Sequence, residues 1–494
     1  MSIIDLKDPT LLVEAAFIGG DWRPAASGRT LEVSDPATGA LVGTVPAGDQ
    51  QDARDAVRAA QAAFGAWRAT TAGQRAALLE RWHALVLENQ DDLARILTAE
   101  QGKPLAEAAG EIRYAASFIK WFAEEGRRIG GRNVPAPEAD RRILVSKEPV
   151  GVSAAITPWN FPAAMITRKC APALAAGCPV VVKPSEMTPF TALALARLAE
   201  RAGFPAGVIN IVTGLPQGIG AELTANPAVR KLSFTGSTRI GSLLMRQCAD
   251  TVKRLSLELG GNAPLIVFDD ADLDLAVAGA MASKFRNAGQ TCVCANRILV
   301  QDGVYEEFAA RLAKAVAALR VGPGTAPGAT IGPLINAAAT EKVRAHVDDA
   351  LSKGAELYAR AECGLDPARF ATPVVLTGAT REMRLAREET FGPVAPLFRF
   401  RHEAEGLELA NDTEYGLASY FYTENLHRAF RVAEGLEAGM VALNTGSIAM
   451  EMAPFGGIKQ SGLGREGGLT GIEEFLETKA FHVGGLKLQE AGIP

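Results

Sequence analysis

Two cysteines, Cys292 and Cys294, lie one residue apart in the segment FRNAGQTCVCANR (285–297). A cysteine thiolate is a good nucleophile toward a carbonyl carbon, although a free thiol has a pKa of about 8.5 and needs activation by its surroundings. The alternative interpretation is a pair of ordinary buried thiols. Residues elsewhere in the chain have to decide between the two.

The other cysteines and the histidines do not suggest a metal site or a disulfide framework. The chain has six cysteines, without a CxxC pair, and five scattered histidines, none in HxxxH spacing. Zinc sites need such clusters, so we expect no metal. The GxSxG elbow of serine hydrolases is also missing. An enzyme of this sequence is therefore expected to use a base other than histidine.

Two polar residues stand at the ends of segments that have the composition of buried strands. Asn160, in PWNFP, follows the predicted strand 151–157, and Glu258 lies at the end of the predicted strand 251–259. The amide of Asn160 can donate to a developing oxyanion, or it can cap the following helix. Glu258 can be a buried general base with a raised pKa, or an ordinary surface residue. Both alternatives are open at this point.

Two further strand ends have residues suited to a nucleotide. Lys183 and Glu186, in KPSE, follow the apolar strand 179–183, and an acidic residue at such a place can accept both hydroxyl groups of a ribose. The alternative is a solvated ion pair in a loop. Gly236 and Ser237 precede a helix whose first N–H groups favour an anion. The GxGxxG fingerprint is missing, so this motif alone does not identify the fold.

Alternating strands and helices are predicted to bring these strand ends together. Residues 150–258 alternate short apolar strands with helical segments, which is typical of a parallel, doubly wound sheet that binds ligands at the carboxyl ends of its strands. A second α/β series begins with a strand over 264–270. It continues with a helix over 273–289 and a strand over 296–301.

The segments outside these two series are predicted to be helical or extended. Three amphipathic helices are expected within 50–125, the second of them over 72–102. Residues 126–149 are predicted to form an extended arm. The C-terminal segment has the pattern of an edge strand, which can pair with the arm near 141–148 or with another subunit.

Size and charge restrict the class of protein. A chain of 494 residues is too long for one hydrophobic core, so we expect two or three domains. The net charge is −5, the pI is about 5.8 and no lysine or arginine tract is dense, which argues against a nucleic-acid partner. Charged residues interrupt the N-terminal segment, and no apolar run reaches the ~18 residues of a membrane span. We expect a cytoplasmic protein without a membrane partner.

Six motifs together resemble the aldehyde dehydrogenase superfamily: PWNFP (158–162), KPSE (183–186), FTGST (234–238), LELGG (257–261), GQTC (289–292) and EETFGPV (388–394). The resemblance implies an α/β fold with two doubly wound α/β domains, one for the cofactor and one catalytic, plus a small β oligomerisation arm. The implied ranges are 1–126 and 147–260 for the NAD-binding domain, 261–465 for the catalytic domain, and 127–146 and 466–494 for the arm.

The resemblance also implies a role for each site residue. Cys292 is implied to add to an aldehyde, with Asn160 and the Cys292 N–H as the oxyanion hole and Glu258 activating the water that hydrolyses the resulting thioester. NAD is expected rather than NADP, because the Glu186 carboxylate would repel a 2′-phosphate. The implied cofactor contacts are Thr157, Trp159, Lys183, Glu186, Gly236, Ser237, Leu259, Glu389 and Phe391.

Longer matches, among them PWNFPAAMITRK and APFGGIKQSGLGREG (453–467), resemble succinate-semialdehyde dehydrogenases. In that group two arginines and a serine bind the distal carboxylate of the substrate. Arg168 and Arg286 match the arginines, whose planar fork suits a carboxylate. The serine aligns with Ala449, and Ser447 is the candidate substitute. A small aldehyde with an anionic distal group is implied: succinic semialdehyde, or alternatively glutarate semialdehyde or a sulfonated or phosphonated aldehyde.

The resemblance raises three further expectations. Members with CxC can form a reversible disulfide, here between Cys292 and Cys294, which would close a small, reducible ring; the alternative for Cys294 is a buried structural thiol. A CoA-acylating or a non-catalytic relative is disfavoured, because such relatives generally lack Glu258 or the nucleophile. The family implies a homo-oligomer, either a tetramer or a dimer.

Overall fold

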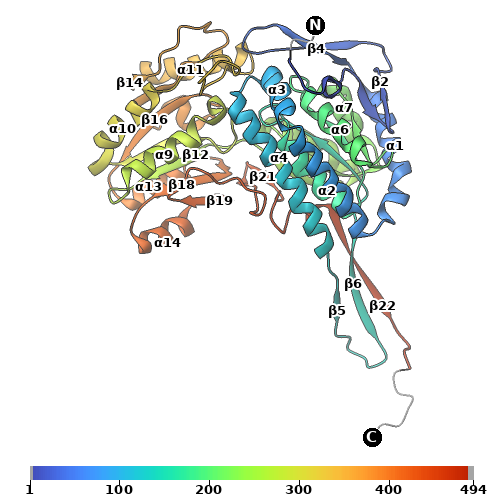
Figure 1. The fold of residues 1–494 in the computed structure, drawn as a ribbon. Coiled ribbons are helices and arrows are strands. Elements are labelled where there is room, and N and C mark those ends of the chain that lie inside the picture. Colours follow the sequence, from blue (N-terminus) through green and yellow to red (C-terminus); the bar gives the residue numbers. More distant parts are fainter. Residues whose placement is uncertain (1–3, 488–494) are drawn as a thin grey trace.

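The computed structural model describes residues 4–487, which form two large sheets and a projecting three-stranded arm (Figure 1). The first sheet has eight strands in the order β2-β1-β9-β8-β7-β10-β11-β21. Antiparallel strands at its edges are β1 (Ala16–Ile18), β2 (Asp21–Arg23) and β21 (Gly462–Leu463). The central strands are parallel and confirm the predicted ones: β7 (Val152–Ile156), β8 (Val180–Lys183), β9 (Ile209–Ile211), β10 (Val229–Thr235) and β11 (Arg254–Glu258).

The strand order of this sheet reverses beside β7. The chain runs from β7 outward through β8 to β9 and then returns to place β10 on the other side of β7. At such a reversal the loops after the two neighbouring strands diverge and leave a crevice. Asn160 follows β7 and Gly236 follows β10, so the two motifs flank this crevice.

The region 50–125 contains four helices, and the prediction of three was wrong. The expected helix 72–102 is interrupted at Asn89, whose side-chain amide donates to the carbonyl of Leu85 at 2.8 Å. An asparagine that bonds the preceding turn in this way competes with helix continuation. The helices that pack on or beside the first sheet are α1 (Gln50–Arg68), α2 (Ala72–Glu88), α3 (Gln90–Gln101), α4 (Leu105–Glu125), α5 (Ala164–Ala176), α6 (Phe190–Ala202), α7 (Pro216–Ala225) and α8 (Thr238–Cys248).

The second sheet has seven strands in the order β14-β15-β16-β13-β12-β18-β19, parallel except for β14. Its strands are β12 (Ala263–Val267), β13 (Ala295–Gln301), β14 (Glu356–Arg360), β15 (Val374–Ala379), β16 (Val394–Phe400), β18 (Ala418–Tyr422) and β19 (Met440–Leu443). The helices of this part are α9 (Leu273–Lys284), α10 (Tyr305–Ala317), α11 (Ala337–Ser352), α12 (Arg384–Arg387), α13 (Glu403–Asn411) and α14 (Leu426–Gly435). The predicted second α/β series is thus confirmed.

The helix predicted over 273–289 is shorter than expected. It ends at Lys284, and a 3-10 turn with two left-handed residues, Asn287 (φ 51°) and Ala288 (φ 54°), replaces its last turn. Left-handed backbone cannot continue a right-handed helix. The chain is therefore redirected just before Cys292.

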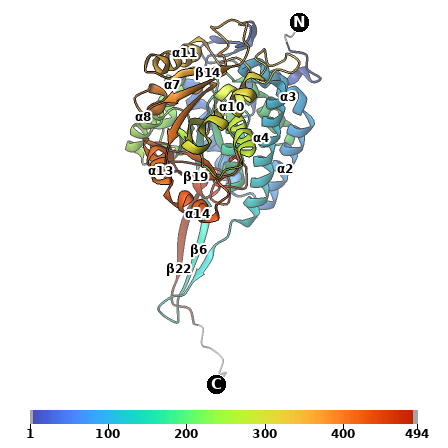
Figure 2. The same ribbon diagram turned by 90° about the vertical axis from the view of Figure 1, so that its left-hand side faces the viewer.

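The arm consists of β5 (Arg132–Val134), β6 (Arg142–Pro149) and β22 (Leu476–Val483) and extends away from the two sheets (Figure 2). β22 pairs antiparallel with β6 from Leu476 opposite Pro149 to Val483 opposite Arg142, which confirms the expected pairing within one chain. Residues 488–494 of the predicted arm lie outside the described residues. Four smaller strands are β3 (Thr30–Ser34), β4 (Leu41–Pro46), β17 (Tyr415–Gly416) and β20 (Ile458–Lys459). None of the helices within residues 4–487 is long and apolar enough to cross a membrane.

Candidate active site

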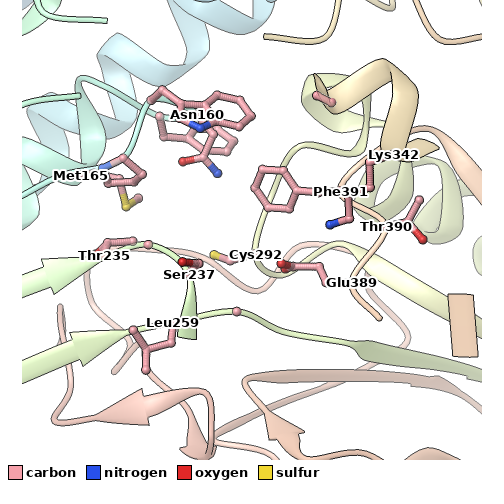
Figure 3. Close-up of a pocket in the computed structure, with 16 residues that line it drawn as sticks. Asn160, Met165, Thr235, Ser237, Leu259, Cys292, Lys342, Glu389, Thr390 and Phe391 are labelled. Atoms are coloured by element: carbon pink, nitrogen blue, oxygen red, sulfur yellow. The ribbon is translucent and has the colours of Figure 1, made fainter. Parts of the chain in front are cut away.

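A cavity of about 270 Å³ lies at the crevice beside β7 and β10. In Figure 3 the Cys292 sulfur lies near its centre, with Asn160 on one side and Glu389 and Phe391 on another. The lining includes these predicted site residues: Trp159, Asn160, Gly236, Ser237, Leu259, Cys292, Glu389 and Phe391. Residues from both sheets therefore meet at one reacting centre.

Asn160 is held by hydrogen bonds on both its main chain and its side chain. Its side-chain Nδ2 donates to the carbonyl of Gln290 at 3.0 Å. Its main-chain carbonyl accepts from Lys103 Nζ at 2.7 Å and from Asn287 Nδ2 at 3.1 Å. The alternative role as a helix cap is wrong, because α5 begins after Ala163 without a side-chain cap. A side-chain amide has two N–H donors, so one remains for a ligand in the cavity.

The loop before Cys292 has an unusual backbone conformation. Asn287, Ala288 and Gly289 are consecutive left-handed residues, and for the two that are not glycine this costs about 1–2 kcal/mol each. The Asn287 N–H donates to Glu107 Oε2 at 2.8 Å, and its side-chain oxygen accepts from Gln101 Nε2 at 3.1 Å. These bonds to the last residue of α3 and to the first turn of α4 offset the strain and fix the position of the loop that leads to Cys292.

Glu258 has the properties of a buried general base. Its side chain is 3% exposed, and within the described chain neither carboxylate oxygen has a hydrogen-bond partner. Burial raises its pKa well above the usual value, and the nearby Glu466 charge adds to this, while Arg168 and Lys169 oppose it. A carboxylate with a raised pKa and free oxygens can take a proton from water near neutral pH.

The Cys292 thiol is not activated by the protein side chains alone. Burial raises its pKa to about 12, and the Glu389 and Glu258 charges add to this, whereas Arg168 lowers it. Cys292 and Glu258 are therefore within electrostatic reach of each other. A positive charge or a hydrogen-bond donor supplied by a bound ligand is needed to stabilise the thiolate.

Glu389 and Phe391 line the cavity and lie in the connection between α12 and β16 of the second sheet. Glu389 Oε1 accepts from the Gly261 N–H at 3.2 Å, and burial raises the pKa of its carboxyl to about 7. Phe391 has a left-handed backbone (φ 58°), and its ring meets the Trp159 ring edge-on at 5.6 Å. The two rings form an apolar wall of the cavity.

The predicted cofactor contacts fit a dinucleotide, although Thr157, Lys183 and Glu186 lie outside the cavity lining. The hydroxyl groups of Thr157 and Thr235 are buried, and neither has a partner in the described chain. Ser237 precedes α8 without capping it, which leaves N–H groups at the helix start for an anion. Lys183 Nζ pairs with Glu186 Oε2 at 2.8 Å at the end of β8. Together these groups suit a nicotinamide dinucleotide.

A second cavity of about 320 Å³ is adjacent to the first, and Phe161 lines both of them. Arg286 and Ala449 both line it, and their contact with the far end of the substrate stays a prediction. The Arg286 guanidinium lies 4.7 Å from the Phe161 ring centroid. Lys103, Glu107 and Glu111 also line this cavity, so it combines positive and negative groups.

Arg168 is buried beside this site, but one carboxylate already pairs with it. Its Nε lies 2.9 Å from Glu466 Oε2, and its guanidinium stacks 4.0 Å from the Phe455 ring centroid. Lys169 pairs with the other oxygen of Glu466. Arg168 Nη2 is buried and has no hydrogen-bond partner in the described chain. One donor of this arginine thus remains for a ligand.

Tyr114 was missed by the sequence reasoning. It lies on α4 and lines the second cavity, and its buried hydroxyl group has no partner among the described residues. Burial raises its pKa while the nearby Arg168 and Arg286 charges lower it, and the net shift is upward. The hydroxyl group therefore stays neutral and can donate to an anion. A tyrosine in an amphipathic helix gives no signal of such a role.

Cys294 and Ser447 lie outside the lining of both cavities, as do the predicted residues Thr157, Lys183, Glu186, Glu258 and Arg168. The Cys294 sulfur accepts a hydrogen bond from Lys284 Nζ at 3.3 Å, and its role in a disulfide with Cys292 stays a prediction. Ser447 is exposed, and its N–H donates to the Thr445 hydroxyl at 3.2 Å. The structure does not bring Ser447 into the cavity that Ala449 lines.

Known proteins resemble this chain over nearly its whole length. The chain is 60% identical to a 3-sulfolactaldehyde dehydrogenase from Pseudomonas putida, over 98% of this chain and 100% of the relative. It is 58% identical to the succinate-semialdehyde dehydrogenase [NADP(+)] GabD of Escherichia coli, over 97% and 99%. The crystal structure of a succinate-semialdehyde dehydrogenase from Burkholderia pseudomallei superimposes with a TM-score of 0.96 at 61% identity, covering 97% of this chain and 100% of that one.

The profile of the aldehyde dehydrogenase family matches residues 22–481. The match spans both sheets and the arm, and it includes every residue of the reacting centre described above. This chain belongs to the aldehyde dehydrogenase family.

Proposed function

We propose that this aldehyde dehydrogenase oxidises succinic semialdehyde, or a closely similar ω-carboxylated aldehyde, with NAD. The observation that carries the proposal is the set of unpaired or cavity-facing donors near Cys292. Arg286 lines the second cavity, and the Tyr114 hydroxyl and Arg168 Nη2 are buried without partners. Buried donors of this kind are costly unless a ligand pairs with them, and a distal carboxylate is such a ligand.

The proposed chemistry uses residues of this chain at each stage. The Cys292 thiolate adds to the aldehyde carbon, and the free N–H of Asn160, with the Cys292 N–H, stabilises the alkoxide of the thiohemiacetal. A bound nicotinamide supplies the hydride acceptor. Glu258 then takes a proton from the water that hydrolyses the thioester on Cys292. The acid leaves and the free thiol returns.

A sulfonated aldehyde is the second candidate substrate. Ala449 lines the substrate cavity where related enzymes are expected to have serine, so the cavity lacks that serine hydroxyl group and has more room at this position for a bulkier anion. The similarity to a 3-sulfolactaldehyde dehydrogenase supports the same alternative. Glutarate semialdehyde, one methylene longer than succinic semialdehyde, uses the same donors.

The arm is proposed to join copies of this chain into a dimer or tetramer. Leu144 on β6 and Phe481 on β22 are apolar and largely exposed. β22 and β5 are the edge strands of the arm sheet, and unpaired edges accept strands of another chain.

The proposed domain ranges, 1–126 with 147–260 and 261–465, follow the two large sheets except at β21, which pairs with β11 of the first sheet.

A panel of aldehydes tests the substrate class. We expect kcat/KM for succinic semialdehyde to exceed that for butanal by about 100-fold or more, because a charge-assisted hydrogen bond contributes about 1.5–3 kcal/mol and several donors are available. Arg286→Met should remove most of this difference while leaving the rate with butanal nearly unchanged. Reduced nicotinamide is followed by absorbance, with sulfonated and glutarate substrates in parallel. Equal rates for succinic semialdehyde and butanal in the wild type would refute the proposal.

Tyr114→Phe tests the residue that the motifs do not show. We expect its KM for succinic semialdehyde to rise about tenfold, because a hydrogen bond to a charged group is lost, while kcat/KM for butanal stays unchanged. Tyr422→Phe is the matched control, since its hydroxyl group is also buried and unpaired within residues 4–487 but lines neither cavity. The assignment fails if both variants, or neither, change the KM for the anionic substrate.

Glu258→Gln separates acylation from hydrolysis. An amide cannot act as a base, so steady-state turnover should fall by about 10²–10⁴-fold while a burst of reduced cofactor remains. In the wild type, turnover should decline as pH falls through the raised pKa of Glu258, well above the usual carboxyl range, because the protonated form is inactive. Stopped-flow absorbance across pH measures both phases. Glu222→Gln, a carboxylate away from both cavities, is the control, and loss of the burst in Glu258→Gln contradicts the assigned role.

The cofactor preference tests Glu186. Its carboxylate pairs with Lys183 at the end of β8, where it would accept ribose hydroxyls and repel a 2′-phosphate. We therefore expect a lower KM for NAD than for NADP, and Glu186→Gln should bring the two values closer. A wild-type preference for NADP, the cofactor in the name of the Escherichia coli relative, would overturn this assignment.

A further inference from the structure

Lys284 and Cys294 are in contact where the loop that carries Cys292 begins and ends. Lys284 is the last residue of α9, and Cys294 directly precedes β13. Lys284 Nζ lies 3.3 Å from Cys294 Sγ, and the sulfur also reaches the Lys284 carbonyl at 3.6 Å. The lysine is fully buried and the cysteine is 5% exposed. The contact closes the base of the loop that holds Cys292.

The partner of Lys284 is unusual for a buried cation. Of the other buried lysines, four pair with a glutamate and one donates to two main-chain carbonyls: Lys103, Lys169, Lys183 and Lys231 have the glutamate, and Lys253 has the carbonyls. Within residues 4–487, Lys284 has no ion pair, and its one hydrogen-bond partner is the thiol of Cys294. A buried ammonium without a carboxylate is costly. Burial raises the pKa of the Cys294 thiol, whereas the Lys284 charge and its hydrogen bond to the sulfur oppose the rise.

Sulfur and amine nitrogen are both nucleophilic atoms when they are unprotonated, and here they are in contact at 3.3 Å. The thiolate form attacks electrophilic oxygen, and the neutral amine has a free electron pair. The amine and the sulfur are separated by a gap that one bridging atom can span with a modest approach of the two side chains. Direct contact and shared burial also keep bulk water from competing for an oxidised sulfur.

We propose that Lys284 and Cys294 form a covalent modification site, at which peroxide joins Lys284 Nζ to Cys294 Sγ through one oxygen atom. The site is distinct from the reacting centre, because neither residue lines the cavity at Cys292. It gives Cys294 a partner other than Cys292. The bridge would tie the end of α9 to the start of β13 and leave the Cys292 thiol free.

The reaction balances with two equivalents of peroxide. The Cys294 sulfur attacks the first peroxide, so an S–O bond forms, the O–O bond breaks and water leaves a sulfenic acid. The Lys284 amine takes an oxygen from the second peroxide and becomes a hydroxylamine, again with loss of water. The hydroxylamine oxygen then attacks the sulfenic sulfur, and a third water leaves the N–O–S bridge.

Tryptic mapping under non-reducing conditions tests the proposal on the full-length enzyme treated with hydrogen peroxide. Trypsin cuts after Arg254, Arg286 and Arg297, and a bridged Lys284 is no longer a cleavage site. The expected product is peptide 255–286 joined to peptide 287–297, heavier than their sum by one oxygen and lighter by two hydrogens. Dithiothreitol should release the two peptides, and the joined species should persist in Cys292→Ser and vanish in Cys294→Ala.

Every other product overturns the proposal. A disulfide between Cys292 and Cys294 gives peptide 287–297 alone, lighter by two hydrogens, with normal cleavage after Lys284. Overoxidation adds oxygen to peptide 287–297 without joining it. Loss of the joined species in Cys292→Ser would assign the bridge to Cys292. Lys284→Arg is the matched control, because it keeps the positive charge beside Cys294 while replacing the amine by a guanidinium, and it should give no joined peptides.

Discussion

The main-chain carbonyl of Asn160 is the point on which the reacting centre depends. It accepts hydrogen bonds from Lys103 and from Asn287, which come from the connection after α3 and from the nucleophile loop. Segments that are far apart in the sequence thus meet at one oxygen atom. Asn160 and Cys292, the proposed oxyanion donor and nucleophile, keep their relative positions because the same buried network holds Asn160 and the loop before Cys292. Catalysis by a fixed dipole requires this kind of pre-organisation.

Charge burial is the second constraint on the site. Glu258, Glu466, Arg168 and Lys169 form a buried group in which two carboxylates face two cations. Glu466 pairs with both cations, and this leaves Glu258 without a hydrogen-bond partner in the described chain. Burial, together with the Glu466 charge, raises the pKa of Glu258. The same group of buried charges therefore holds one paired carboxylate and one with the properties of a base.

The sequence predicted the parts of this site that depend on local residue patterns. The parallel strands and the residues at their carboxyl ends were found because apolar runs and strand-end polar residues recur at regular intervals. Tyr114 and Lys103 were not found, because their importance arises only when α4 packs beside the loop after β7. The break at Asn89 was missed because it depends on one local side-chain hydrogen bond, to the Leu85 carbonyl, within a segment whose apolar spacing predicts a continuous helix.

The strained loop before Cys292 has a further effect through Gly289. A Cβ atom at this left-handed residue would lie 2.3 Å from the carbonyl oxygen of Gly392, so the two backbones are in close contact. Gly392 directly follows Phe391, which lines the cavity on the cofactor side. Neither backbone can shift toward the other without a clash. The wall of the cavity at Phe391 and the loop that holds Cys292 therefore share one contact, and a side chain at Gly289 would separate them.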